Sequence, residues 1–181
     1  MPIIPDTKNW TWVLERACPE CGFDSAQVEP SSVPVHVLRL GAAWSSVLSG
    51  RDSDAVRARP SDDRWSPLEY GCHTRDVFRK FDERLHLMLE FHNPTFPNWD
   101  QDATAITDRY GEQDPALVAK EVKAAAAVLS QSFEALPADS WQRTGTRSDG
   151  PGFTIETFAR YLVHDPVHHL HDVGVDYHLK P

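Results

Sequence analysis

The chain has 181 residues, of which 40% are hydrophobic and 25% charged, with six Trp and eight Phe. This length and aromatic content exclude a wholly disordered chain and fit one globular domain. The net charge of −9 makes the surface repel phosphate backbones and anionic lipid headgroups, so we expect neither nucleic acid nor a membrane as a partner. No apolar run approaches the roughly 20 residues that a membrane span needs.

Two further features concern the compartment. The stretch from Met1 to Trp12 has neither the basic region nor the apolar region of a signal peptide. The three cysteines cannot all pair, which disfavours a disulfide framework. We therefore expect a cytoplasmic protein.

The N-terminal part differs in character from the rest. Residues 1–31 are interrupted by proline, and we predict an irregular segment that packs on the remainder of the chain. Its expected packing anchors are Trp10, Trp12, Val13 and Leu14. The first helix is predicted from Ser32 to Leu48, where apolar residues recur at helical spacing, and Gly50 ends it. A charged loop follows, from Arg51 to Arg64.

The second helix has the clearest start signal. In Ser66-Pro67-Leu68-Glu69, serine takes the N-cap, proline the first helical position, and glutamate the third position after the cap, which is a capping box. We predict that the helix runs to about Glu90. The long connection from Asn93 to Asp114 is not a tight hairpin and can return across one end of a bundle.

Two more helices complete the predicted fold. The third begins at Asp114-Pro115 and ends near Leu136, and the fourth is capped by Thr154 and runs from Ile155 to about Leu179. No segment alternates with period 2, so we expect no strands. The prediction is an all-α, four-helix bundle over residues 32–181.

Histidines gather in the predicted fourth helix: His164, His168, His169, His171 and His178. Residues four apart share one helix face, which suits a metal ion. At about 100° per residue, with Asp165 at zero, the apolar face centres at roughly 90° and His169 lies near 40°. His168 and His164, near 300° and 260°, are therefore expected to form an outward pair that is solvated or faces a loop.

Asp165 and His169 are thus the inward pair. Asp172, near 340° on the same wheel, is expected to hold the second ring nitrogen of His169. Pro166 leaves an alternative open, because a proline can restart the helix. Asp165 would then be an N-cap, and His169 an ordinary hydrogen-bonded buried histidine.

A third ligand is expected from the second helix. Val77, Phe81, Leu85 and Met88 form a ridge along one face, and its next member toward the N-terminus is His73. A lone histidine on an apolar face is often a core residue, but the pair on the fourth helix gives His73 a partner.

Two motifs carry a family resemblance. Trp65-Ser66-Pro67-Leu68-Glu69-Tyr70-Gly71-Cys72-His73 and Asp165-Pro166-Val167-His168-His169-Leu170-His171-Asp172-Val173 resemble the DinB/YfiT-like superfamily, which includes the N-terminal domain of mycothiol-dependent maleylpyruvate isomerase. The resemblance implies a four-helix bundle with a divalent metal held at one end by His73, Asp165 and His169. Asp165 stands where many members have histidine, and the mycothiol isomerase branch uses a carboxylate there.

The resemblance also implies a function. We expect a metal-dependent S-transferase or isomerase for a small-molecule substrate that uses mycothiol or bacillithiol, with Zn²⁺ as the first choice and Ni²⁺ or Fe²⁺ able to bind the same ligands. A hydrolase that uses bound water and a non-catalytic metal-binding bundle are the alternatives. Many family members are dimers, so a homodimer is expected.

Other signals are given less weight. Cys18-Pro19-Glu20-Cys21 is half of a zinc knuckle and lacks a visible second pair, so two packed or exposed thiols are preferred over structural zinc or a redox dithiol. Cys72 points away from His73 on the wheel and is not expected to be a nucleophile. Glu83 and His86 lack the partner motif of a di-iron site. The remaining histidines are expected to be surface or capping residues: His36, His86, His92 and His178.

Overall fold

The computed structural model describes residues 9–50 and 52–179. Residues 1–8, and with them most of the stretch expected to lack a signal peptide, lie outside the described residues, as does Arg51 of the charged loop. In chain order the elements are η1 (Trp10–Leu14), η2 (Ser25–Gln27), η3 (Pro30–Ser32), α1 (Val33–Ser49), α2 (Ser53–Arg57), α3 (Pro67–Glu90), β1 (Thr95–Phe96), α4 (Gln101–Thr107), η4 (Tyr110–Glu112), α5 (Pro115–Glu134), η5 (Ser140–Gln142), β2 (Thr144–Arg147), β3 (Gly152–Thr154) and α6 (Ile155–Asp172).

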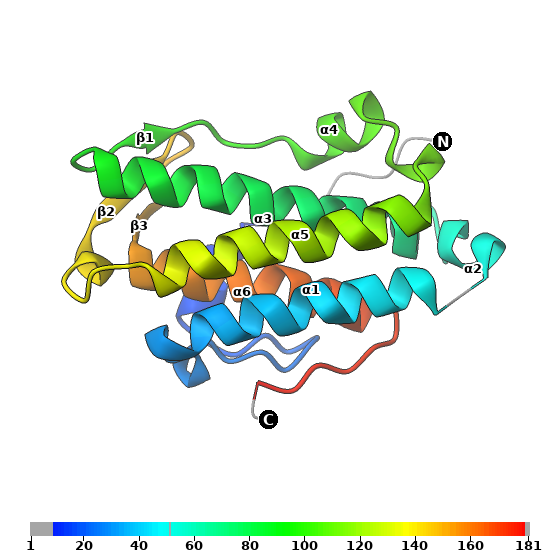
Figure 1. The fold of residues 1–181 in the computed structure, drawn as a ribbon, viewed down its shortest axis with the longest axis horizontal. Coiled ribbons are helices and arrows are strands. Elements are labelled where there is room, and N and C mark those ends of the chain that lie inside the picture. Colours follow the sequence, from blue (N-terminus) through cyan, green and yellow to red (C-terminus); the bar gives the residue numbers. More distant parts are fainter. Residues whose placement is uncertain (1–8, 51, 180–181) are drawn as a thin grey trace.

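The long helices α1, α3, α5 and α6 form a bundle (Figure 1), which confirms the predicted fold class. The start of α3 shows why the sequence predicted it well. The backbone N–H of Glu69 donates to the Ser66 hydroxyl at 3.3 Å, and the Ser66 N–H donates to the Glu69 carboxylate at 2.9 Å. Both donors at the helix end are satisfied within four residues, so the signal is local.

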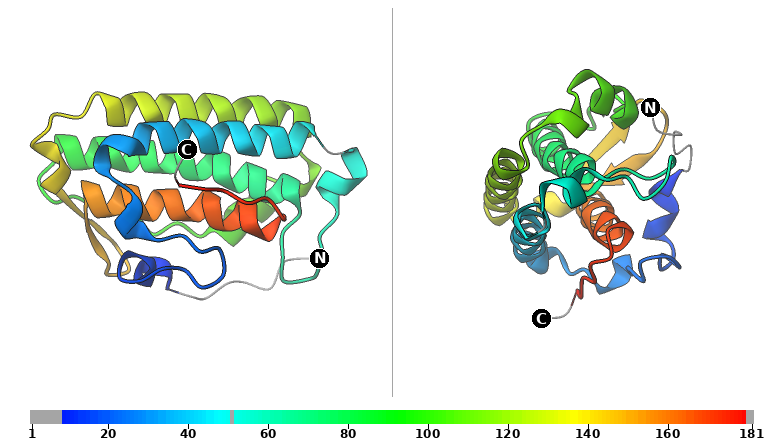
Figure 2. Two further views of the ribbon diagram at one scale, coloured as in Figure 1. Left: turned by 90° about the horizontal axis from the view of Figure 1, so that it is seen from below. Right: turned by 90° about the vertical axis from the view of Figure 1, so that its right-hand side faces the viewer.

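The helix directions are not simply up and down. Arg75 and Asp82 of α3 bond Glu121 and Ser132 of α5, so these two neighbours run parallel. By contrast, α1 and α6 run the opposite way, and the end-on view in Figure 2 shows the ring order α1, α5, α3, α6. Parallel neighbours need a connection as long as the bundle. Residues 91–114 therefore run along the bundle and carry β1 and α4, instead of returning across one end.

A small sheet corrects the expectation of no strands. β1 pairs in parallel with β2, and β2 pairs antiparallel with β3. The sheet joins the start of the long connection to the residues before α6 (Figure 1). Its strands are two to four residues long, and β1 lies far along the chain from its partner. Such short segments cannot show a period of 2, which is why the sequence pattern missed them.

The structure decides the alternative at Pro166 and corrects the predicted end of α6. The helix continues through Pro166 with Thr154 as its N-cap, as the helical wheel assumed, so Asp165 is not an N-cap. It ends at Asp172, not near Leu179, because Gly174 adopts a φ of +75° and its N–H donates to the His171 carbonyl at 2.9 Å. This is the left-handed glycine that commonly ends a helix.

Segments outside the four long helices cover parts of them. His36 of α1 is buried and its Nδ1 lies 3.0 Å from the Tyr177 hydroxyl, so the expected surface position is wrong. The reason is that the chain after α6 crosses back over α1. At the other end of the chain, residues 10–28 pack along α6, with Val13, Phe23 and Val28 buried. The part of the predicted N-terminal segment that the structure describes therefore lies against α6.

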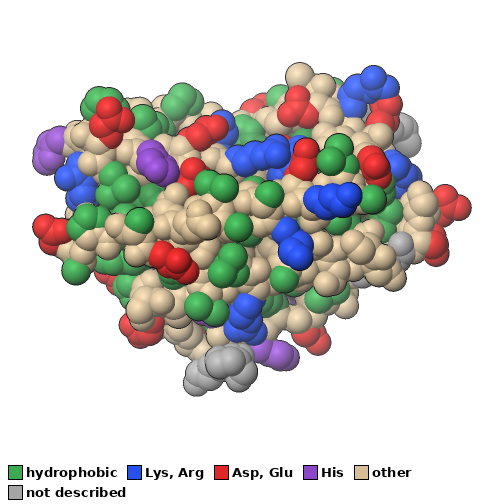
Figure 3. Space-filling view, viewed as in Figure 1, with side chains coloured by type: hydrophobic (Ala, Val, Ile, Leu, Met, Phe, Trp, Pro, Cys, Tyr) green, Lys and Arg blue, Asp and Glu red, His purple; other side chains and the backbone are tan. Residues whose placement is uncertain are grey.

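The outer surface is mixed. On the face drawn in Figure 3, hydrophobic side chains are interspersed with charged ones. The large apolar side chains exposed on α1 and α5 are Val35, Leu38, Leu117 and Val128. Among the described helices, none is long and apolar enough to cross a membrane. The expected homodimer stays a prediction.

The closest approach of α1 and α5 generates a stability prediction. A Cβ at Gly41 would overlap the Cβ of Ala126 and lie 3.4 Å from the Val122 carbonyl oxygen. We expect Gly41→Val to lower the free energy of unfolding by about 1–3 kcal/mol, because the helices must move apart. Urea denaturation measures it, with the exposed Ala42→Val as control, since that change costs at most about 0.7 kcal/mol of helix propensity. Equal losses in the two variants would contradict the close contact.

Candidate metal centre

Three side chains from two helices meet at one end of the bundle. His73 lies in the second turn of α3, and Asp165 and His169 lie one turn apart on α6. These helices run antiparallel, so the beginning of α3 faces the end of α6 (Figure 1). One ligand atom from each of the three residues lies within 4.8 Å of the other two. The structure therefore brings together the three residues that the sequence singled out.

The geometry centres on one carboxylate oxygen. Asp165 Oδ1 lies 3.2 Å from His73 Nε2 and 3.9 Å from His169 Nε2. This oxygen is buried and has no hydrogen-bond partner of acceptable geometry among the described residues, and His73 is completely buried. Buried polar atoms are normally satisfied. Two ring nitrogens facing an unsatisfied carboxylate oxygen fit a divalent cation, which accepts lone pairs from all three.

Electrostatics keep Asp165 in the form that binds cations. Burial by itself raises the pKa of this carboxyl, but His73, His169 and His164 outweigh burial and hold the pKa below its usual range. Asp165 is therefore a carboxylate at neutral pH. Asp165 can therefore act as a metal ligand at neutral pH. The groups that lower its pKa are histidines and not a lysine or an arginine.

Aromatic rings hold the two imidazoles, and sequence reasoning missed them. Tyr70 stacks on His169 with ring centroids 4.5 Å apart, and Trp99 stacks on His73 at 5.3 Å with an interplanar angle of 8°. Trp65 also contacts His73, with ring centroids 5.2 Å apart. Trp65 and Tyr70 sit inside the motif around the capping box and could have been noticed there. Trp99 comes from the long connection, and no sequence signal places it.

Asp172 occupies the expected place behind His169. Its Oδ2 lies 3.1 Å from His169 Nδ1, and its Oδ1 lies 3.7 Å from Arg64. Burial raises the pKa of Asp172, but His169, His168 and Arg64 together lower it below the usual range. A carboxylate on Nδ1 leaves Nε2 of His169 as the atom that faces Asp165.

Tyr161 adds a hydroxyl one turn before Asp165. Burial and the charge of Asp165 raise its pKa, although Arg147 and Arg84 act in the opposite direction. Tyr161 is therefore a neutral hydroxyl at physiological pH, and it also forms a hydrogen bond with Arg147. Helical spacing alone could have placed it one turn before Asp165.

Of the two environments expected for His164 and His168, the structure shows the loop-facing one and not the solvated one. His164 and His168 are 3% and 6% exposed, because the N-terminal segment covers the face of α6 that points away from the bundle. Burial, followed by the nearby His168, lowers the pKa of His164 to about 3. The wheel gave their direction correctly, but it carries no information about a distant segment that covers them.

The residues given less weight behave largely as expected. Cys72 is buried, and burial raises the pKa of its thiol to about 12, so it is a neutral thiol and not a nucleophile. Glu83 and His86 are exposed on α3. His92 and His178 are exposed as well.

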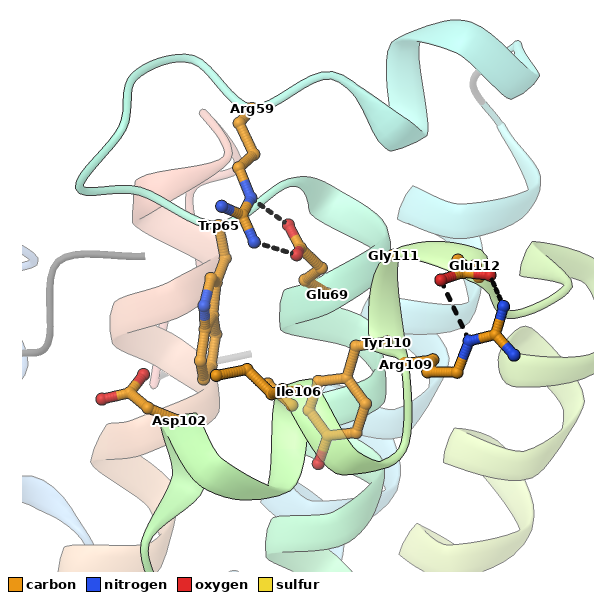
Figure 4. Close-up of a pocket in the computed structure, with 10 residues that line it drawn as sticks. Arg59, Trp65, Glu69, Asp102, Ile106, Arg109, Tyr110, Gly111 and Glu112 are labelled. Atoms are coloured by element: carbon orange, nitrogen blue, oxygen red, sulfur yellow. Dashed lines mark hydrogen bonds and ion pairs between the residues drawn. The ribbon is translucent and has the colours of Figure 1, made fainter. Parts of the chain in front are cut away.

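A cavity near the start of α3 shares Trp65 with the surroundings of the candidate metal centre, although none of the three candidate ligands lines it. Its volume is about 440 Å³, within the range of small-molecule sites. Trp65 forms part of its wall (Figure 4). The same ring contacts His73. Ile106 and Tyr110 line it from the long connection, and the ion pairs Arg59–Glu69 and Arg109–Glu112 border it.

Comparisons with known proteins agree with this architecture. A family model described as the DinB superfamily matches residues 38–173. Among solved structures, the chain is similar to YfiT from Bacillus subtilis, described as a probable metal-dependent hydrolase with an unusual four-helix bundle topology. The TM-score is 0.73 at 14% identity, over 86% of this chain and 89% of that chain, so this likeness is one of fold. No curated protein matches the chain significantly in sequence.

The capping box next to the site generates a pH prediction. Burial raises the pKa of Glu69, but Arg59 and Ser66 outweigh burial and lower it. A depressed folded-state pKa contributes stability above the unfolded pKa of about 4.3, and this stability is lost as pH falls. In the presence of EDTA, we expect Glu69→Gln to cost about 1–3 kcal/mol at pH 6. The cost shrinks at pH 3, because protonation then removes the advantage of the native carboxylate.

Urea denaturation of both proteins at the two pH values measures this difference. The other carboxylates titrate in both proteins, so their contribution cancels. Glu83→Gln, on the exposed side of the same helix, is the matched control and should change little at either pH. A cost for Glu69→Gln that is the same at both pH values would show that the Glu69 carboxylate is not preferentially stabilised in the folded state.

Proposed function

The chain belongs to the DinB superfamily, and from this premise we propose that it is a divalent-metal-dependent enzyme that activates a low-molecular-weight thiol. His73, Asp165 and His169 hold the ion. The observation that carries the proposal is the unsatisfied Asp165 Oδ1 between the ring nitrogens of two histidines. Sites with three protein ligands and a free position are typical of catalytic metals, whereas structural sites are closed.

The chemistry of the three ligands indicates which ion can bind and which reaction it can assist. A bound divalent ion is a Lewis acid, which lowers the pKa of a thiol or a water molecule that coordinates it. Two neutral imidazoles and one carboxylate suit Zn²⁺, and Ni²⁺ or Fe²⁺ can take the same donors. Among these, Zn²⁺ is our first choice.

The surrounding residues position the ligands. Tyr70 and Trp99 fix the planes of His169 and His73, and Asp172 holds His169 Nδ1. Asp172 is thereby engaged by His169 and by Arg64, so it is poorly placed to take a proton from a substrate. A thiol, whose ordinary pKa is about 8.5, needs less help from a base than water does. This favours a thiol as the activated group.

The cavity beside Trp65 suits the organic part of the small-molecule substrate. Its walls combine aromatic and aliphatic side chains with charged groups at the border (Figure 4). This combination is common in small-molecule sites, where a few polar groups orient an otherwise apolar ligand.

Hydrolysis is the second candidate function. The neutral hydroxyl of Tyr161 on the Asp165 side favours it, because a leaving group needs a proton donor. The similar structure YfiT is described as a probable metal-dependent hydrolase. In this version of the proposal the same three ligands act, and water takes the place of the thiol.

The first test is metal content. We expect His73→Ala, Asp165→Ala and His169→Ala each to lose one equivalent of bound metal relative to the wild type, because each removes one of three donors. Atomic emission on protein purified without a histidine tag measures it. His86→Ala, on the exposed side of α3, is the control and keeps the wild-type content. Unchanged metal in all three variants would contradict the ligand set.

The second test separates the two chemistries. We expect mycothiol or bacillithiol, added to the Co²⁺-substituted protein, to increase the near-ultraviolet charge-transfer absorption, because thiolate binding to Co²⁺ is intensely coloured. Glutathione serves as the comparison thiol. Any band from the protein's own cysteines is present before the addition, so the increase is the measured quantity.

Ile106→Trp sharpens this titration. Ile106 lines the cavity from an exposed position, so a larger ring there should narrow the cavity, weaken thiol binding at least several-fold and leave the Co²⁺ content unchanged. If no thiol alters the spectrum at millimolar concentration, the thiol proposal fails. Hydrolysis of model esters or amides by the metal-loaded protein would then support the second function, and its absence would leave a non-catalytic metal-binding bundle.

A further inference from the structure

A second group of potential metal ligands lies on the opposite face of α6. Cys18 and Cys21 come from the turn between η1 and η2, and His164 and His168 come from α6. One ligand atom from each of these four residues lies within 4.8 Å of the other three. The two histidines supply the second pair of ligands that the Cys18–Cys21 knuckle needs for a complete zinc site. We propose that these four residues bind a structural Zn²⁺ that fastens the N-terminal segment to α6.

The distances suit a tetrahedral ion. Zn–S bonds near 2.3 Å and Zn–N bonds near 2.0 Å place neighbouring ligand atoms about 3.3–3.8 Å apart. Cys18 Sγ lies 3.7 Å from His168 Nδ1. His164 and His168 are four residues apart on one helix, which puts both rings on the same face. Their ring centroids are 5.2 Å apart.

The backbone of the turn that carries Cys18 and Cys21 directs both thiols toward α6. The Gly22 N–H donates to the Cys18 carbonyl at 2.9 Å, and the Cys18 N–H donates to the Phe23 carbonyl at 2.8 Å. Gly22 has a φ of +71°, a conformation that glycine adopts without strain. The loop therefore closes tightly over two residues between the cysteines and presents both sulfurs to α6.

One polar atom of the cluster, His164 Nε2, is buried without a partner, which indicates that a ligand belongs there. His164 is 3% exposed, and its Nε2 is buried without a hydrogen-bond partner among the described residues. Leaving such a nitrogen unsatisfied costs about 1–3 kcal/mol. Cys18 is 1% exposed, so water has little access from that side. A metal ion at the centre of the cluster satisfies the nitrogen.

The surroundings resemble a closed structural site. The Trp10 ring lies 4.7 Å from the His168 ring and 5.6 Å from the His164 ring, and Phe23 meets His164 edge-on at 5.2 Å. These rings cover the cluster. Two thiolates and two neutral imidazoles also balance the charge of Zn²⁺, so a neutral unit is buried. Four protein ligands leave no position for substrate, in contrast to the three-ligand site.

Two carboxylates lie near His168 Nε2, the ring nitrogen that does not face Cys18. Glu20 lies 3.8 Å from His168 Nε2, and Asp172 lies 3.9 Å from the same atom. Ligating histidines commonly direct their second nitrogen toward such groups. Asp172 also contacts His169 Nδ1, so one carboxylate stands behind ligands of both sites. The second site therefore helps to fix the position of Asp172, and through it His169.

The test uses the full-length protein without a tag and without added thiol. We expect about two equivalents of zinc in the wild type. The double variant Cys18→Ser/Cys21→Ser and the single variant His164→Ala should each lose one equivalent. Cys72→Ser, which removes the buried cysteine of α3, is the matched control and should lose none. His73→Ala should lose the other equivalent, and the loss should add to that of the double variant.

Co²⁺ substitution gives an independent readout. The wild type, Cys72→Ser and His73→Ala should show a thiolate-to-Co²⁺ charge-transfer band, and the double cysteine variant should lack it. This band separates the second site from the proposed enzyme site, whose ligands contain no sulfur. If the enzyme proposal fails, this band is still expected, because it comes from Cys18 and Cys21.

X-ray absorption of the zinc-loaded wild type removes the risk that a variant fails to fold. It should show sulfur neighbours at about 2.3 Å. Absence of a sulfur shell would overturn the proposal.

Discussion

Burial of α6 on two opposite faces is the constraint on which the rest of the structure depends. One face packs into the bundle, and the other is covered by residues 10–28. Side chains four residues apart share a face of a helix. Asp165 and His169 therefore turn toward α3, while His164 and His168 turn toward the cysteine turn. A single stretch of helix thus supplies pairs of potential metal ligands to two separate clusters, and the sequence neighbours His168 and His169 belong to different ones.

The arrangement depends on α6 staying helical through Pro166. Proline removes the backbone N–H that would bond the carbonyl of Leu162. The helix is held from outside instead: the Trp44 indole donates to the Pro166 carbonyl at 3.2 Å, and Thr154 caps the start. A break at Pro166 would rotate the following turn and separate Asp165 from His169. Tertiary packing therefore preserves the spacing on which both clusters rely.

The long connection from α3 to α5 also shapes the surroundings of the candidate metal centre. Because these helices are parallel neighbours, residues 91–114 must run the length of the bundle. This path brings Trp99 onto His73 and sets Ile106 and Tyr110 at the cavity beside Trp65. An up-and-down bundle with short turns would leave this end of α3 without such a cover. The parallel course of α3 and α5 thus supplies walls of the candidate site.

The sequence by itself determined the four long helices, the exact start of α3, and the inward direction of His73, Asp165 and His169. These features rest on local signals, namely capping residues and helical periodicity, which need no distant partner. Only the tertiary structure decided the parallel course of α3 and α5, the short strands, the continuity of α6 through Pro166, and the burial of His164 and His168. Each of these depends on contacts between segments far apart in the chain, whose energies no local pattern contains. The pairing of Cys18 and Cys21 with two histidines near the other end of the chain is the clearest case, because a helical wheel shows which way a side chain points but not what lies there.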